Sequence, residues 1–355
     1  MSTAEADARV GKLFDDRFQI HRKIGGGESG GVYLAEHPDG AQVALKIVER
    51  DGPTPIAVKR FLREIEVTRR LHHPHIVLVH EAGETSSGEL YLAMELLKGR
   101  TLQRQLRQHG PMDAPRIVSI ARQIAFALEA AHTQKVLHRD LKPANIRLIA
   151  REGSPDFVKV LDFAIARFME DEEEDDGEQL TAVGKVVGTP YYMAPEQIAN
   201  KALDARCDLY ALGCILYEMA TGRTPFIGRT FEVMRQHAFD RPPSPSAIAA
   251  RPLPPALEQL IYALLAKEPA DRPANARAVV EALDRIEAGE VAERPQGVSF
   301  GASTDDDSVP TSEPLTEEPG LSPTSLALAG FSGVLALGLL AIAVVGVGVF
   351  VWLGR

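Results

Sequence analysis

The chain has 355 residues, and 45% of them are hydrophobic, which is enough for a sizeable buried core. Its formal net charge of −10 excludes nucleic acid as the main partner, because binding to a phosphate backbone needs a basic face. Much of this charge is local, since eight of the nine residues 170–178 are acidic. Cys207 and Cys214 lie in an apolar helical pattern, so we predict two buried thiols on one helix face and no disulfide between them.

The N-terminal part of the chain has the pattern of a small sheet. In chain order the predicted elements are a polar lead at residues 1–17, strands at 32–35 and 43–48, a helix at 61–71 and a strand at 89–95. Farther along, apolar residues recur at intervals of three and four, which predicts an amphipathic helix. These residues are Ile117, Ile120, Ala121, Ile124, Leu128 and Ala131. Because strands dominate early and helices later, we predict an α+β fold with a small β-rich N-lobe and a larger α-helical C-lobe.

The composition changes after the globular region, which we expect at residues 18–286. Residues 287–325 are rich in Pro, Ser, Thr and Glu, with few large apolar groups, and this is typical of a disordered linker. Residues 326–353 carry no charge and are long enough to cross a bilayer, so we predict a transmembrane helix followed by a short tail at 354–355. The alternative is a buried soluble helix, which would be unusual at this length and uniformity.

A short polar motif carries the strongest chemical signal. The run His138-Arg139-Asp140-Leu141-Lys142-Pro143-Ala144-Asn145 places a carboxylate, a cation and an amide within one probable loop. Asp140 can accept a proton from a hydroxyl, Lys142 can hold a phosphate, and Asn145 can ligate Mg²⁺. These are the groups that phosphoryl transfer requires, because that reaction depends on positioning and on neutralising phosphate charge.

A glycine run lies farther upstream, between two predicted strands. Gly25, Gly27 and Gly30 precede Val32, and glycines let backbone amides approach phosphate oxygens without obstruction by side chains. A flexible turn is the commoner explanation for such a run taken alone. Its place between strands, rather than between a strand and a helix, argues against a dinucleotide-binding fold.

Two further charged residues follow apolar runs. Lys46 ends one run and needs a carboxylate partner if it is to be held against phosphates. We predict Glu64 as this partner rather than Glu66, which points to another helix face. Asp162 follows the apolar strand 158–160, and its hard carboxylate oxygens make it a second candidate ligand for Mg²⁺.

These motifs, in this order, resemble those of the bacterial Hanks-type (eukaryotic-like) transmembrane serine/threonine protein kinases. The resemblance extends from about Phe18 to Ile286. It implies a two-lobed protein-kinase fold with ATP in the cleft, Mg²⁺ as the cofactor and protein substrates. The expected reaction is transfer of the ATP γ-phosphate to Ser or Thr hydroxyls of proteins, including the kinase itself.

The resemblance also implies roles for individual residues of the site. Asp140 would orient and deprotonate the substrate hydroxyl. Lys46 and Lys142 would neutralise phosphate charge, and Asn145 and Asp162 would hold Mg²⁺.

The adenine base would meet a different set of residues. Val32 would cover it, Met94 would be the gatekeeper, and the backbone of Glu95 and Leu97 would form the hinge that contacts it.

Four other residues bear on the framework and on the alternatives. Glu196 would pair with Arg272, and Asp208 would brace the catalytic loop from a buried helix. Ala164 replaces the glycine that usually follows the Asp-Phe pair, and its Cβ restricts positive φ angles. A pseudokinase scaffold that binds nucleotide or partners without turnover therefore stays open as an alternative, as does a small-molecule kinase of similar fold.

The location follows from the same expectations. The predicted span would anchor the protein in the cell membrane as a single-pass protein, with a dimer possible for trans-autophosphorylation. Arg355 is the only cation near the span and weakly favours a cytosolic C-terminus. ATP, Mg²⁺ and reduced cysteines instead require a cytoplasmic kinase domain, and we expect this second argument to decide the orientation.

Overall fold

A computed structural model of the chain describes residues 7–27, 30–48, 55–151, 153–163 and 190–289. All of these belong to the first of two compact units, Met1–Arg294. The predictions about Ala164, the acidic run 170–178 and the span 326–353 lie outside the described residues. Among the residues that are described, no helix combines the length and the apolar character needed to cross a membrane.

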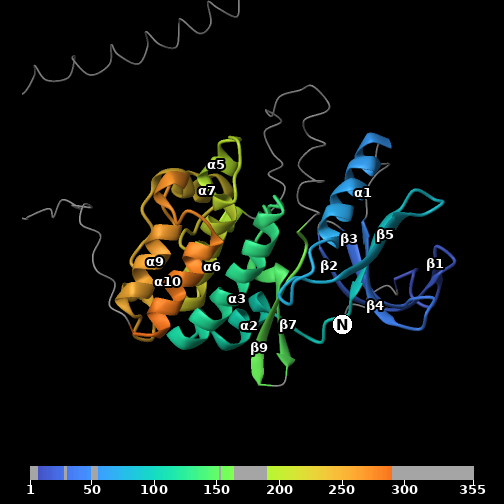
Figure 1. Cartoon of the computed structure of the whole chain (residues 1–355), viewed down its shortest axis with the longest axis horizontal. Coiled ribbons are helices and arrows are strands. Elements are labelled where there is room, and N and C mark those ends of the chain that lie inside the picture. Colours follow the sequence, from blue (N-terminus) through green and yellow to red (C-terminus); the bar gives the residue numbers. More distant parts are fainter. Residues whose placement is uncertain (1–6, 28–29, 49–54, 152, 164–189, 290–355) are drawn as a thin grey trace, which may run out of the picture. The chain divides into compact units, whose positions relative to one another are not determined.

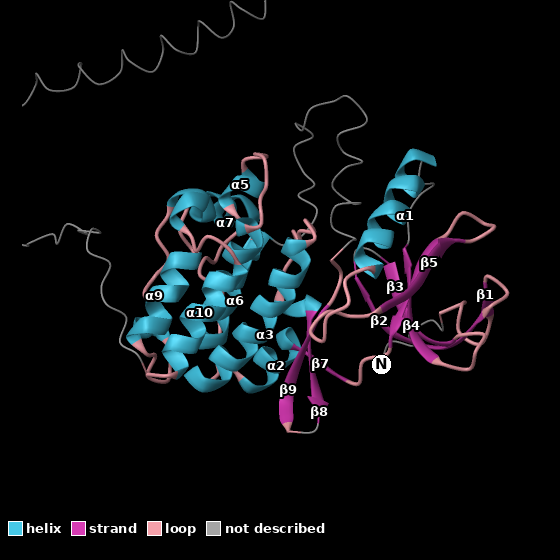
Figure 2. Ribbon diagram, viewed as in Figure 1, coloured by secondary structure: helices cyan, strands magenta, loops and turns pink. Residues whose placement is uncertain are grey.

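The small lobe is built on a six-stranded antiparallel sheet in the order β1-β2-β3-β4-β6-β5 (Figures 1 and 2). Its strands are β1 Leu13–Phe14, β2 Phe18–Gly27, β3 Gly30–Glu36, β4 Gln42–Val48, β5 Val79–Glu84 and β6 Leu90–Glu95, and its helix is α1 Pro55–Arg69. Side chains alternate across a strand, so β4 directs Ala44 and Val48 into an apolar cluster with α1 and directs Leu45 and Ile47 into a second cluster on the opposite face. The predicted strands and the predicted helix of this lobe are confirmed, and α1 begins earlier than expected.

Both ends of the folded region extend beyond the predicted boundaries at Phe18 and Ile286. At the N-terminal end, β1 pairs with β2, and Phe14 is buried against the outer face of the sheet. At the other end, Glu287 is still the last residue of helix α10, and its carboxylate accepts a hydrogen bond from Arg122 at 2.6 Å. The polar lead therefore includes residues that belong to the small lobe.

The large lobe is helical. Its helices are α2 Leu102–His109, α3 Ala114–Thr133, α5 Pro195–Ile198, α6 Arg206–Thr221, α7 Thr230–Phe239, α8 Pro245–Ile248, α9 Pro255–Leu264 and α10 Ala276–Glu287. The predicted amphipathic helix is confirmed as α3, and every apolar residue that defined its pattern is buried. Helix α6 is apolar almost all round and is correspondingly buried on nearly every face. Cys207 and Cys214 lie on it as buried free thiols, as predicted, and burial raises the pKa of both.

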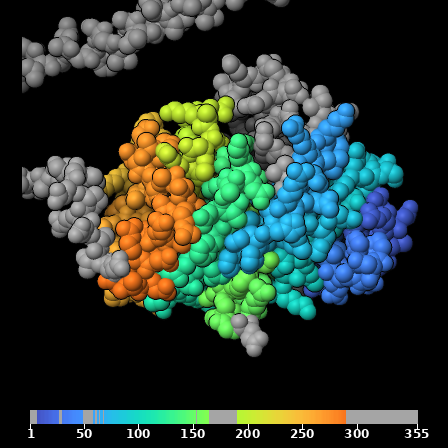
Figure 3. Space-filling view, in the orientation of Figure 1, coloured from blue at the N-terminus to red at the C-terminus, as the bar shows by residue number. Residues whose placement is uncertain are grey.

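A second sheet connects the lobes. It has the antiparallel order β7-β8-β9, with β7 Gly99–Thr101, β8 Ile146–Arg151 and β9 Ser154–Val160. The end of β9 reaches the small lobe, where the amide of Val77 donates to Val160 O at 3.0 Å and the amide of Val160 donates to His75 O at 2.8 Å. On the face in Figure 3, light-blue residues of the small lobe touch green residues of the large lobe. These contacts fix the strand that leads into Asp162.

Candidate active site

The predicted catalytic loop lies between α3 and β8, and a buried carboxylate holds its backbone. Asp208 on α6 is 1% exposed and accepts the amides of His138 and Arg139, each at 2.8 Å. The predicted brace is therefore confirmed. Arg139 has a φ of +63°, which costs a non-glycine residue roughly 1–3 kcal/mol unless its surroundings enforce it. Asp208 enforces it from one side, and Gln197 donates to Arg139 O at 2.9 Å from the other.

The protonation state of this brace is also controlled by its partners. Burial alone would raise the pKa of the Asp208 carboxyl, but a 2.8 Å hydrogen bond from His132 and the amide of His138 outweigh it. The pKa consequently lies below its ordinary value. An ionised Asp208 can accept both loop amides at once, so the loop conformation depends on this charge.

Asp140, Lys142 and Asn145 converge within the loop. Lys142 Nζ lies 2.7 Å from Asp140 Oδ2. The side-chain amide of Asn145 donates to Asp140 O at 2.9 Å and to Asp140 Oδ2 at 3.3 Å. The Asp140 side chain is 49% exposed, and no donor among the described residues engages its second oxygen, Oδ1. One carboxylate oxygen is thus fixed by the loop, and none of the described residues donates to the other, which can accept from an incoming hydroxyl.

Lys46 and Asp162 form an ion pair that joins the two lobes. Lys46 projects from β4 with only 6% of its side chain exposed, and its Nζ lies 3.1 Å from Asp162 Oδ1. Asp162 has a φ of +62°, a second strained backbone position at the site. The preceding residue, Leu161, is fixed at both ends of its backbone: its amide donates to Asn145 O, and its carbonyl accepts from His138 Nε2, each at 2.8 Å. The structure therefore brings Asp162 next to the catalytic loop.

The donor set at this point suits a hard divalent cation. Asn145 directs its amide nitrogen to Asp140, which leaves its amide oxygen for another partner. The hydrogen bond from the Leu161 amide to Asn145 O places Asn145 beside the residue that precedes Asp162. One carboxylate and one amide oxygen are a sufficient protein contribution for Mg²⁺, which takes its other ligands from water and phosphate.

The predicted glycine run forms the end of the β2–β3 hairpin. Gly27 is paired with Gly30, and Gly25 with Val32. Gly30 has a φ of +118°, a backbone conformation that residues other than glycine rarely adopt. Val32 is in turn paired with Lys46 on β4, so the glycine hairpin and the lysine lie on adjacent strands.

The predicted hinge is tied to both lobes. Met94 is buried in the apolar cluster that the small-lobe sheet forms with α1. The Glu95 carboxylate accepts from Lys159 Nζ at 2.6 Å, and the Leu97 carbonyl accepts from Arg147 at 2.8 Å.

Sequence reasoning missed this role of Arg147, which also donates to Gly99 O at 3.2 Å. Burial lowers the pKa of its guanidinium. The sequence feature that could have revealed this role is the arginine at the second position of β8, among apolar residues.

The carboxylate partner proposed for Lys46 is only partly accounted for. Glu64 lies on α1, as predicted, but its side chain is outside the described part of the structure, so the pairing stays a prediction. The rival Glu66 is 52% exposed and lies 3.4 Å from Arg69 and 3.7 Å from Arg70. This agrees with the expectation that Glu66 points to another helix face.

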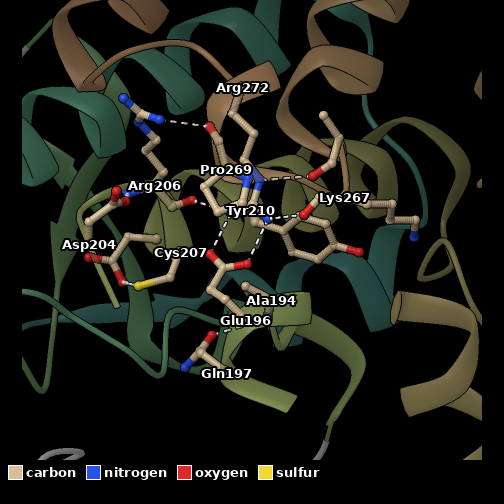
Figure 4. A network of polar contacts seen from close by, with 12 residues as sticks. Ala194, Glu196, Gln197, Asp204, Arg206, Cys207, Tyr210, Lys267, Pro269 and Arg272 are labelled. Atoms are coloured by element: carbon tan, nitrogen blue, oxygen red, sulfur yellow. Dashed lines mark hydrogen bonds and ion pairs between the residues drawn. The ribbon is translucent and has the colours of Figure 1, made fainter. Parts of the chain in front are cut away.

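The expected pair of Glu196 and Arg272 is confirmed (Figure 4). Two parallel hydrogen bonds of 2.6 and 2.7 Å join the groups, and their side chains are 5% and 0% exposed. The other donors of the Arg272 guanidinium bind the carbonyls of Ala266, Arg206 and Lys267. The Tyr210 ring lies 4.9 Å from the guanidinium carbon. Every N–H of this buried cation is therefore satisfied.

Comparison with known proteins agrees with this geometry. A family profile described as "Protein kinase domain" matches residues 18–283. The chain is 40% identical to serine/threonine-protein kinase pkn3 of Myxococcus xanthus over 81% of its length and 53% of the relative's. It is 37% identical to serine/threonine-protein kinase PknH of Mycobacterium bovis, over 91% of its own length and 52% of the relative's. It is 38% identical to serine/threonine-protein kinase PknE of Mycobacterium tuberculosis, over 82% of its own length and 51% of the relative's. The chain thus spans about half the length of these curated relatives. It belongs to the protein kinase family, among the bacterial Hanks-type serine/threonine protein kinases.

Proposed function

We propose that this protein transfers the γ-phosphate of ATP to Ser and Thr hydroxyls of proteins. The observation that supports this best is the ion pair between Lys46 of the small lobe and Asp162 of the large lobe, beside a loop that brings together Asp140, Lys142 and Asn145. These five residues come from segments far apart in the sequence. Their convergence supplies two cations, two carboxylates and one amide, the set that phosphoryl transfer from ATP requires.

The phosphate side of the reaction falls to Lys46, Lys142 and the glycine hairpin. The two ammonium groups would neutralise phosphate charge, and the hairpin amides would donate to phosphate oxygens. Asn145 and Asp162 would hold Mg²⁺ through their side-chain oxygens. Mg²⁺ held there would supply positive charge to offset the negative charge that develops on the phosphate oxygens.

The acceptor side falls to Asp140. Lys142 and Asn145 fix its Oδ2, and Oδ1 would accept the hydrogen bond of a substrate Ser or Thr hydroxyl and then its proton. Because Lys142 lies 2.7 Å from this carboxylate, it would reach the transferred phosphate while still orienting the base. The pairing of base and cation in one loop couples the two halves of the reaction.

The adenine base would lie between Val32 and the hinge. The Glu95 amide donates to Leu78 O at 2.9 Å, and the Leu97 carbonyl accepts from Arg147. The Glu95 carbonyl and the Leu97 amide are therefore the hinge groups that we assign to adenine. Met94, buried behind the hinge, would be the gatekeeper.

We also propose that residues 326–353 anchor the protein in the cell membrane, with the kinase domain in the cytoplasm. The support is the uncharged run itself together with the need for ATP, Mg²⁺ and reduced thiols. Two copies held in one membrane would meet often, which favours phosphorylation of one copy by another. Removing residues 326–355 and separating soluble from membrane fractions tests the anchor: the shortened chain should become soluble.

The catalytic proposal is tested with the purified chain in detergent, γ-labelled ATP, Mg²⁺ and a generic protein acceptor. We expect label on the acceptor and on the kinase, recovered as phosphoserine and phosphothreonine after acid hydrolysis. A chain that binds nucleotide but transfers no label, with Mg²⁺ present, would instead support the non-catalytic scaffold. Label found only on a small molecule would support a small-molecule kinase.

A further inference from the structure

Residues 7–12, here called the N-terminal strap, lie against the sheet beside the glycine hairpin. The amide of Gly11 donates to Ile20 O at 2.9 Å, and the amide of Ile20 donates to Lys12 O at 3.0 Å. These bonds continue the pairing of β1 with β2. Backbone hydrogen bonds thus hold the strap at its C-terminal end, Gly11 and Lys12, and its first residues extend to the neighbouring strand β3.

Asp7 of the strap joins two strands through one carboxylate oxygen. Its Oδ2 accepts from the Tyr33 hydroxyl at 2.8 Å and lies 3.2 Å from Lys23 Nζ. Lys23 on β2 and Tyr33 on β3 are direct cross-strand partners. Arg9 also donates to the Tyr33 hydroxyl at 3.4 Å and to Glu89 at 3.0 Å. The strap therefore holds both strands of the hairpin just before its glycines begin.

Tyr33 carries this contact toward the glycines. Its side chain is fully buried. A Cβ placed on Gly31 would lie 2.7 Å from the Tyr33 ring, so the ring lies directly over the Gly31 backbone. Gly31 is paired with Gly26, in the part of the hairpin that has no side chains of its own to fix its height above the sheet. The ring provides the packing that these glycines lack.

We propose that the N-terminal strap is a positioning element for nucleotide binding, which acts through Tyr33 on the glycine hairpin, residues 25–27, 30 and 31. This inference rests on the proposed kinase function. A glycine-rich hairpin samples many conformations, and only a fraction of them presents its amides to phosphate. The apparent affinity for nucleotide falls in proportion to that fraction, so loss of the strap contacts weakens binding. Bound nucleotide orders the hairpin itself, so the rate at saturating ATP changes little.

The test uses two variants of the full chain, Tyr33→Phe and Asp7→Ala. Each removes one side of the 2.8 Å hydrogen bond and leaves the ring in place. The matched control is Tyr91→Phe on β6. Tyr91 is also buried and accepts from an arginine of the N-terminal region, Arg17, at 3.1 Å. It too covers a glycine, Gly83, but β6 is separated from the hairpin strand β3 by β4.

We expect Tyr33→Phe and Asp7→Ala each to raise KM for ATP about 2- to 10-fold, the range that one lost hydrogen bond supports, with kcat changed less than about 2-fold. The rise of KM in the double variant should be less than the product of the two single effects, because both substitutions remove the same contact between Asp7 and Tyr33. Hydrogen–deuterium exchange of the amides of residues 25–27, 30 and 31 should become faster in both variants. Tyr91→Phe should change neither KM nor this exchange.

Unchanged exchange in Tyr33→Phe, or an equal rise of KM in Tyr91→Phe, would overturn the inference. The exchange measurement needs no turnover. If the chain transferred no phosphate at all, the proposed function would fail while hairpin exchange still decided whether the strap acts as proposed. A thermal unfolding midpoint close to that of the parent confirms that each variant is folded.

Discussion

Glu196→Gln would measure what burial adds to an ion pair in this protein. The pair with Arg272 has two short hydrogen bonds, and both side chains are almost inaccessible to solvent. Glutamine keeps the shape of glutamate, so no cavity forms, but it turns an NH₂ group toward one guanidinium nitrogen and removes the countercharge. Leaving a buried charge without its partner costs about 3–5 kcal/mol. Because the glutamine oxygen retains one hydrogen bond, we expect the lower end, about 3 kcal/mol.

The same lobe provides a matched control. Arg235 and Asp240 form a bidentate pair with distances of 2.9 and 2.8 Å, but their side chains are 58% and 38% exposed. Asp240→Asn makes the same chemical change where water can replace the lost partner, so it should cost at most about 1 kcal/mol.

Urea unfolding followed by far-ultraviolet circular dichroism gives both free energies, and added salt should weaken only the exposed pair. Equal costs for the two substitutions, or a cost below about 1 kcal/mol for Glu196→Gln, would refute the reasoning from burial.

Three further outcomes follow from single contacts. Burial lowers the pKa of His237 from 6.5 to about 3, so the unfolded chain takes up a proton at a higher pH than the folded protein does. The free energy of unfolding should therefore not depend on this group above about pH 6.5, and it should fall by about 1.4 kcal/mol for each pH unit between about pH 6.5 and pH 3. Urea titrations at pH 7, 6 and 5 measure this slope, and His237→Gln should remove it. Arg147→Leu strips the carbonyls of Leu97 and Gly99 of their donor, and urea unfolding should show a loss of about 2 kcal/mol; an unchanged midpoint would mean that water replaces the guanidinium. Asp208→Asn cannot accept both catalytic-loop amides, so kcat should fall about 10-fold or more while KM for ATP stays within about 2-fold; a change in KM alone would contradict a role confined to the loop.

The catalytic loop and the secondary structure could be predicted because their signals are local. The motif from His138 to Asn145 contains its own chemistry, and the periodicity of α3 depends only on which residues face the core. The pair of Glu196 and Arg272 and the brace by Asp208 were predicted through the resemblance to a family. Spacing along the chain would not have revealed them, because more than sixty residues separate the partners.

The contacts of the N-terminal strap could not be predicted in this way. Residues before Phe18 are polar and have no periodicity, so they look like a solvated lead. Their order comes from single hydrogen bonds between distant residues, such as Asp7 with Tyr33 and Arg9 with Glu89. The role of Arg147 could not be predicted for a related reason. Its partners are backbone carbonyls, which every residue has, so the sequence does not indicate which of them it binds.

We propose that Asp140 acts as the base in phosphate transfer to a hydroxyl. Its most direct test is the single-turnover rate of labelled phosphate transfer at saturating ATP and Mg²⁺, measured for the parent and for Asp140→Asn together with nucleotide affinity. We expect the variant to keep its fold and to bind nucleotide within about 3-fold of the parent, while the transfer rate falls about 10²- to 10⁴-fold, the range for loss of a general base. A variant that transfers phosphate at nearly the parent rate would show that Asp140 is not the base.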